Sequence, residues 1–209
     1  RLGDDGYRIP SPAEDDWEQQ RGGLVAKPGE ISRRHSDAIH ALWQPQPSYT
    51  LHNVKAFRAG LYLNGRAVVE GDIDFHLALS EPDDLAEAVK EARKRSQAET
   101  TSIFWVAELN DSIARETQEL FRSREILSRK ERGAQTKDET ALVAEERRRQ
   151  RRHDEELRRL LKQALLAGSV FFRGNERVPQ GTPTEVPRAA ADVLGTALPE
   201  LFDRSEEAA

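Results

Sequence analysis

The pattern of apolar and polar positions changes several times along this chain, and each change marks a predicted element. Residues 6–10 indicate a short edge strand that a proline ends. Ser11-Pro12-Ala13-Glu14 has the order of a capping box and predicts a helix start, and Arg21-Gly22-Gly23 breaks that helix. A second helix is expected over residues 30–43, with the core-facing candidates Ile31, Ile39, Leu42 and Trp43.

Between residues 50 and 79 the period becomes two, which is the period of half-buried strands. Residues 57–69 surround Asn64-Gly65, the pair that a type I′ turn favours, so they predict a β-hairpin. Residues 73–79 continue the alternation as a third strand. We expect these three strands to form an antiparallel meander.

Residues 84–97 carry apolar positions three or four apart and predict a helix. The next run, SIFWVAEL at residues 102–109, is apolar almost throughout, as expected for a central strand that is covered on both faces. A helix followed by a buried strand indicates that the sheet is mixed rather than a pure meander.

Residues 111–168 predict a helical hairpin inserted between two strands. Asn110 or Asp111 can cap the first arm, which ends near Gly133, and residues 137–166 form the returning arm. Each arm has a seam at heptad-like spacing, the first at Ile113, Thr117, Leu120, Phe121 and Leu127, the second at Leu142, Leu157, Leu160, Leu161, Ala164 and Leu165.

The returning arm contains a polar tract, residues 145–156, without an apolar side chain. Ion pairs four residues apart are expected to support its helix, namely Glu145 with Arg149, Asp154 with Arg158 and Glu155 with Arg159. A helix that is polar all round either projects into solvent or meets a partner.

After Gly168, residues 169–172 predict a strand and residues 173–176 a turn, and a last amphipathic helix runs from about residue 182 to Pro199. The predicted fold class is therefore α+β, with a small mixed or antiparallel sheet, packed helices and a long inserted, coiled-coil-like hairpin. The expected divisions are a helical linker segment at 1–48, a sheet domain at 49–110 and 168–204, and the hairpin at 111–167.

Composition narrows the function classes. The chain has 209 residues and no cysteine, which excludes disulfides, thiolate nucleophiles and cysteine-ligated metal sites and fits a reducing cytoplasm. A net charge of −5 argues against a protein that coats nucleic acid globally. No apolar run reaches the length of a membrane span. The absence of any methionine suggests a piece of a larger protein.

The sequence contains few candidates for catalytic chemistry. The glycines sit in hairpins rather than in a phosphate-binding loop, no serine has a nucleophile-elbow context, and the spacing of His35 and His40 suits one metal poorly. Asp72, Asp74 and His76 form a titratable row that could act as acid and base or bind a divalent ion. Alternating polar residues are also what the wet face of any half-buried strand contains, and this structural interpretation is favoured.

A basic run is the one feature with a possible ligand; its arginines are Arg147, Arg148, Arg149, Arg151 and Arg152. These side chains could contact a nucleic-acid phosphate backbone. However, acids flank the run and no aromatic residue is interleaved for base stacking, so contact with a protein partner or plain solvation are the alternatives.

The order of motifs resembles the central region of the large P-loop ATPases of BREX bacteriophage-defence systems, the BrxC/PglY family. The resemblance rests on GYRIPSPAEDDWE near the start, AFRAGLYLNGRAV, GDIDFHLAL, TSIFWVAEL, the charged hairpin, SVFFRGNERVP and the closing ALPELFDR. It implies that GYRIPS is the wing and exit of a winged-helix element, so that residues 1–48 form a winged-helix-exit and helical linker segment. It also implies that the ATPase module, with its ATP and magnesium, lies upstream.

The resemblance therefore implies a cytoplasmic, non-catalytic module without a cofactor of its own, which assembles with other BREX proteins or neighbouring subunits in antiviral defence. The alternative is a DNA-phosphate-binding module of the same ATPase that uses the basic helix. No catalytic residue can be carried over, because every matching motif is structural.

Overall fold

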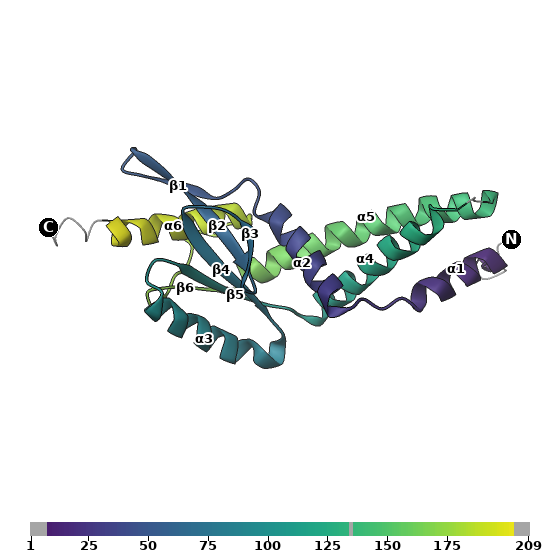
Figure 1. Cartoon of the computed structure of the whole chain (residues 1–209), viewed down its shortest axis with the longest axis horizontal. Coiled ribbons are helices and arrows are strands. Elements are labelled where there is room, and N and C mark those ends of the chain that lie inside the picture. Colours follow the sequence, from purple (N-terminus) through teal and green to yellow (C-terminus); the bar gives the residue numbers. More distant parts are fainter. Residues whose placement is uncertain (1–7, 134–135, 203–209) are drawn as a thin grey trace. The chain divides into compact units, whose positions relative to one another are not determined.

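The computed structural model describes residues 8–133 and 136–202, which fall into two compact units (Figure 1). Within the described residues, we call them the helical unit, residues 8–35, 114–133 and 136–157, and the sheet unit, residues 36–113 and 158–202. The expected division set residues 1–48 apart as a linker segment. The compact units instead group residues 8–35 with most of the predicted hairpin.

The helical unit contains α1 (Pro12–Gly22) and parts of α2 (Pro28–Leu42), α4 (Asp111–Lys130) and α5 (Lys137–Leu166). The predicted capping box is present at α1, because the Ser11 side chain accepts from Glu14 N and Glu14 accepts from Ser11 N. Thr136 and Glu139 form a second capping box at the start of α5. Asn110 caps α4, as predicted, by accepting from Ile113 N at 2.9 Å.

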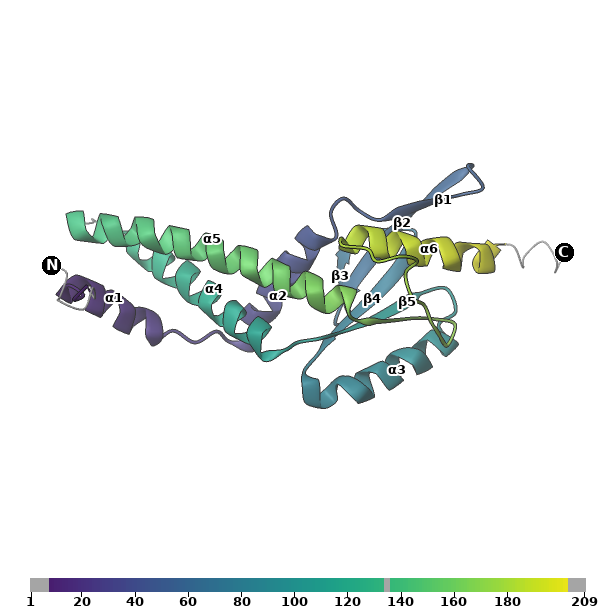
Figure 2. The same cartoon turned by 180° about the vertical axis from the view of Figure 1, so that it is seen from behind.

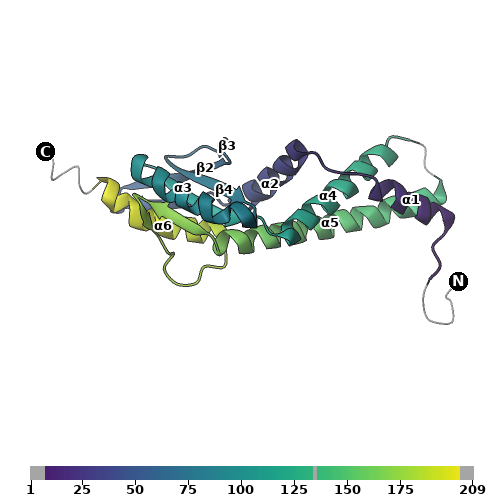
Figure 3. The same ribbon diagram turned by 90° about the horizontal axis from the view of Figure 1, so that it is seen from below.

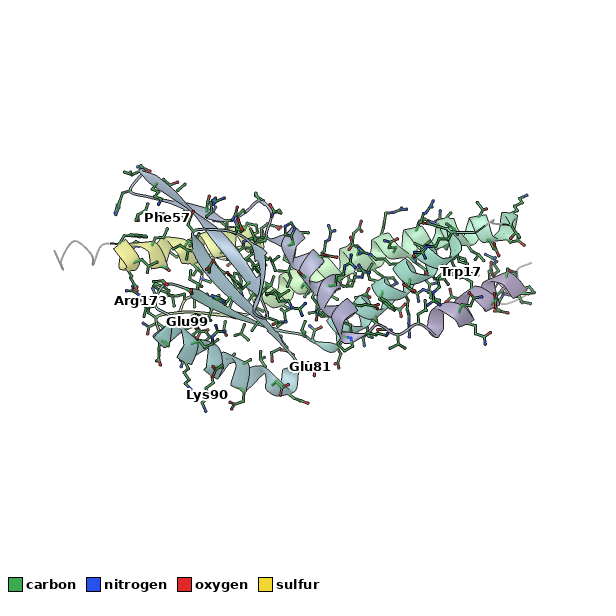
Figure 4. The ribbon with its side chains drawn as sticks, in the orientation of Figure 1. Trp17, Phe57, Glu81, Lys90, Glu99 and Arg173 are labelled. Carbon is green, nitrogen blue, oxygen red and sulfur yellow. The ribbon has the colours of Figure 1, made fainter. Side chains whose placement is uncertain are left out.

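The apolar core of the helical unit is small. Trp17 of α1, labelled in Figure 4, packs in one cluster with Phe121, Ile126 and Leu127 of α4 and Val143 of α5. The helices α1, α4 and α5 lie side by side in both views (Figures 1 and 3). The apolar seam predicted for the hairpin is therefore partly covered by α1. Coiled-coil packing between the two arms stays a prediction.

The sheet unit is built on a seven-stranded sheet with the order β1-β2-β4-β5-β6-β7, in which β3 pairs with β2 off this path. The strands are β1 (Ser48–Leu51), β2 (Lys55–Leu63), β3 (Arg66–Val69), β4 (Ile73–Ser80), β5 (Ile103–Glu108), β6 (Ser169–Phe172) and β7 (Asn175–Glu176). β5 lies between β4 and β6, as its continuous apolar run predicted. The α+β class and the mixed sheet are confirmed.

The expected antiparallel meander is wrong. β2 and β3 form the predicted hairpin, and Asn64 (φ 47°) and Gly65 (φ 83°) take the positive φ of its turn. β4, however, pairs parallel to β2 on the other side. The connection from β3 crosses β2 at Gly60, so closely that a Cβ on Gly71 would lie 2.2 Å from Gly60 N. Two glycines therefore permit a crossover that a meander does not need.

Helices cover both faces of the sheet. On one face α3 (Leu85–Ala98), which follows a short 3₁₀ turn (Pro82–Asp84), packs on Phe104, Val106 and Phe171. Successive strand residues point to opposite faces. Accordingly Trp105 lies on the other face, with ring centroids 6.3 Å from Trp43 and 6.4 Å from Phe75.

The last helix, α6 (Val186–Phe202), lies along the β1 and β2 side of the sheet (Figure 2). Its predicted apolar face is buried at Val186, Ala190, Val193, Leu194 and Leu198. The expected end at Pro199 is wrong, because the helix continues through this proline to Phe202, whose ring lies 4.9 Å from Phe57. Gly195 admits the Tyr49 ring of β1, which a Cβ would approach to 2.9 Å.

Candidate interaction surfaces

The inner side of the polar tract meets α1 of the same chain. Arg21 Nε, at the end of α1, donates to Glu146 Oε1 at 2.7 Å, and the side chains are 4% and 1% exposed. Arg21 also donates to Glu119 Oε2 at 2.6 Å and to Ser123 Oγ at 3.2 Å, both on α4. The sequence left open whether the polar tract meets a partner or only water. On its inner side the partner is α1 of the same chain.

Charges around this pair are mutually compensating. Burial by itself raises the pKa of Glu119, but hydrogen bonds and charge from Arg21, and then from Arg122, outweigh it and hold that pKa below its usual value. Burial by itself lowers the pKa of Arg149. The hydrogen bond to Glu18 and the charge of Glu146 outweigh burial, so the net effect is a raised pKa. The Glu119 carboxylate and the Arg149 guanidinium group are therefore ionised at neutral pH.

Three of the five candidate arginines have acidic partners in the chain. Arg149 pairs with Glu18 of α1 and lies 3.5 Å from Glu146, rather than acting as the expected helix-surface partner of Glu145. Arg148 takes that role instead, at 2.6 Å from Glu145, and its hydrogen bond lowers the Glu145 pKa. Arg147 donates through two nitrogens to Glu131 Oε1, at 2.9 and 2.6 Å.

The other two candidates, Arg151 and Arg152, are exposed and form no ion pair with the residues that the structure describes, although the charge of Arg152 helps to lower the Glu145 pKa. Arg151 lines a cleft of about 540 Å³ between α4 and α5, which we call the α4–α5 cleft. From α4 the cleft is lined by Arg124, Leu127, Ser128 and Glu131. From α5 it is lined by Arg147, Gln150, Arg151 and Asp154. Of the two arginines without an ion pair, Arg151 therefore lines the cleft and Arg152 lies outside it.

Two histidines of the helical unit are held by α4. His35 is buried, its Nε2 lies 3.0 Å from Thr117 Oγ1, and burial lowers its pKa to about 4, so its ring is neutral near pH 7. His153 Nδ1 lies 2.6 Å from Glu116 Oε2. Neither contact gathers the set of ligands that a metal ion needs, and within residues 8–133 and 136–202 no group of His, Asp and Glu does so.

The row Asp72, Asp74 and His76 is engaged structurally. Asp72 accepts from Arg58 N at 2.8 Å, and this hydrogen bond lowers its pKa. The His76 ring is stacked between Tyr62 and Phe104, with centroids 4.9 and 5.0 Å away, and burial lowers its pKa. These contacts support the structural interpretation of the row, as the wet side of a packed strand.

A surface that the sequence did not single out is the free edge of β1. This strand pairs with β2 on one side, and no described strand pairs with its other side. Pro47 O accepts from Ala59 N, so alternation directs the backbone N–H and C=O of Ser48 and Thr50 away from β2. The strand carries no charged residue, and Val54 at the tip of its hairpin is 86% exposed.

Short-range sequence patterns predict some of these residues but not others. The ion hub of Arg21, Glu119 and Glu146 joins three helices across 98 and 125 positions of sequence, so no short-range pattern predicts it. Arg21 looked like part of a helix-breaking turn. The β1 edge could have been noticed, because a short uncharged strand precedes the hairpin.

Comparisons of this chain with protein-family models, with curated proteins and with solved structures found no match. Among the described residues, no helix is both long and apolar enough to cross a membrane.

Proposed function

We propose that this chain is a non-catalytic assembly module of a BREX bacteriophage-defence ATPase and makes protein–protein contacts in a cytoplasmic defence complex. The order of sequence motifs supports the family. The free β1 edge supports the contact, and it is the observation that carries the proposal. In this proposal ATP and magnesium belong to the upstream module, and the chain itself holds no cofactor.

The β1 edge suits the addition of a partner strand. Edge strands normally carry a charge, a proline or a bulge that prevents pairing with another chain. Ser48–Leu51 has none of these. The outward backbone N–H and C=O groups of Ser48 and Thr50 are two residues apart, so a partner strand could form ladder hydrogen bonds with both. An extended segment of another BREX protein is the partner that this edge fits.

The outward side of the polar tract is a second contact in this proposal. Its inner side is covered by α1, so the docking expected of the hairpin is confined to the exposed side, with Glu145, Arg148, Arg152 and Glu155. These charges are mixed in sign, which favours a polar protein partner over a polyanion.

DNA contact through the basic helix is the weaker alternative. Arg147, Arg148 and Arg149 are each paired with a carboxylate, so a phosphate would have to compete for them. If the alternative holds, DNA affinity falls steeply with salt, and replacing Arg151 and Arg152 with glutamine removes most of that dependence.

The edge is tested with two substitutions at one position. Thr50→Pro removes the outward N–H without touching a bond to β2, whereas Thr50→Ala keeps the N–H and removes only the hydroxyl. In a pull-down with the other proteins of a BREX complex, we expect Thr50→Pro to lose the partner and Thr50→Ala to keep it.

Equal recovery of partners with both variants would contradict strand addition. A charge reversal on the outward side of α5, Arg148→Glu with Arg152→Glu, tests the second contact separately. If the complex still assembles with all of these variants, the assembly role itself is wrong.

A further inference from the structure

We propose that the α4–α5 cleft binds a phosphate group through Arg151 and Arg124. This site does not depend on the assembly role, since it uses a different surface from the β1 edge. The cleft lies entirely within the helical unit, and its volume of about 540 Å³ is within the range of small-ligand sites.

The cleft contains more hydrogen-bond donors than acceptors. Arg124 Nε is buried and has no acceptor among the described residues, although Arg124 Nη2 lies 3.5 Å from Asp154 Oδ1. Arg151 adds a whole guanidinium group without an acidic partner. A buried donor without an acceptor is costly, so these groups favour an acceptor-rich ligand.

The acids in the cleft do not cancel this surplus. Glu131 accepts from two nitrogens of Arg147, and Asp154 pairs with Arg124. Two carboxylates against the three guanidinium groups of Arg124, Arg147 and Arg151 leave one positive charge. Because Arg147 and Arg124 are each offset by a carboxylate, the remaining positive charge belongs to Arg151.

Neutral donors in the cleft distinguish a phosphate from a carboxylate. Ser128 Oγ accepts from Arg132 at 3.3 Å, which leaves its hydroxyl hydrogen available, and Gln150 contributes an amide on the facing helix. A phosphate offers three or more acceptor oxygens, enough for Arg forks and these neutral donors together, whereas a carboxylate offers two. The phosphate can be free, as in pyrophosphate, or belong to a nucleic-acid backbone.

The test is titration of the whole chain with pyrophosphate at low ionic strength, followed by calorimetry and by the amide NMR signals of α4 and α5. We expect saturable binding that Arg151→Gln weakens at least about tenfold, the effect of one charge-assisted contact. Arg152→Gln is the matched control. It removes the same charge at the next position, outside the cleft, and should change the affinity less than about twofold.

A second titration with a DNA duplex separates the two sources. Binding of pyrophosphate without DNA binding assigns the site to a free oxyanion, and a parallel loss of both in Arg151→Gln assigns it to backbone phosphate. Absence of pyrophosphate binding in the millimolar range overturns the proposal. Equal losses of pyrophosphate affinity in Arg151→Gln and Arg152→Gln overturn it as well. So does a chain that binds a glutamate-rich peptide but does not bind pyrophosphate.

Discussion

The two units of this chain are stabilised in different ways. In the sheet unit, Phe75, Trp105 and Phe171 lie in layers of buried apolar side chains, as do all but the last residue of β5. The helical unit has one small apolar cluster and a buried hub in which Arg21 holds Glu146 and Glu119. The difference shows that a polar helix need not protrude into solvent. Its charged side chains can pack against neighbouring helices when they find oppositely charged partners there.

The largest effect is expected in the apolar unit. Phe75→Ala removes a fully buried ring that contacts Trp43 and Trp105, and it should lower the free energy of unfolding of the sheet unit by about 3–5 kcal/mol. Urea denaturation combined with amide hydrogen exchange of β4 and β5 measures it. A loss below about 1 kcal/mol would mean that this core is loosely packed.

In the helical unit a single charge should matter nearly as much. Arg21→Met leaves Glu146 buried without its donor, and we expect a loss of about 3–4 kcal/mol, read from hydrogen exchange of α1 and α5 amides. Arg129→Met, which breaks an exposed pair with Glu125, is the control and should cost less than about 0.5 kcal/mol. If the two variants lost the same stability, the Arg21 hub would contribute no more than an ordinary surface ion pair.

The pH dependence of the helical unit should also reflect its buried polar groups. His35 has a folded pKa of about 4 against an ordinary 6.5, so the unfolded chain binds a proton first as the pH falls. Stability is then lost between pH 6.5 and about 4, by about 2–3 kcal/mol, and is fully present above pH 6.5. His35→Gln should flatten this part of the stability curve. An unchanged curve would mean that His35 does not titrate differently in the two states.

The smallest predicted effect is local. Ser11→Ala removes the side chain that caps α1 and should cost about 1 kcal/mol, with faster exchange limited to the first turn of that helix. Ser11→Asp, which keeps a capping oxygen, should restore the protection. Loss of protection in the sheet unit would contradict the separation of the two units.

Local signals in the sequence predicted the elements well. The capping box at Ser11, the Asn64-Gly65 turn and the cap at Asn110 each involve residues within four positions of one another. What could not be predicted depends on distant residues. The crossover at Gly60 and Gly71 brings β4 parallel to β2, and the Arg21 hub decides which side of the polar tract is covered.

The candidate site divides along the same line. The arginine run was visible in the sequence, but the separation of Arg151 from its paired neighbours requires the positions of Glu18 and Glu131 on other helices. The β1 edge depends on which strands remain unpaired in the finished sheet, and therefore on topology rather than composition.

A double-mutant cycle on Arg21 and Glu146 tests most directly whether the polar tract has its partner within the chain. The stability of α1 is measured by hydrogen exchange in the parent chain, in Arg21→Met, in Glu146→Leu and in the double variant. We predict a coupling energy of about 1–3 kcal/mol, with the double variant more stable than either single one. A coupling below about 0.3 kcal/mol would contradict this claim, because Arg21 and Glu146 would then act independently and their buried pair would not hold α1 against the tract.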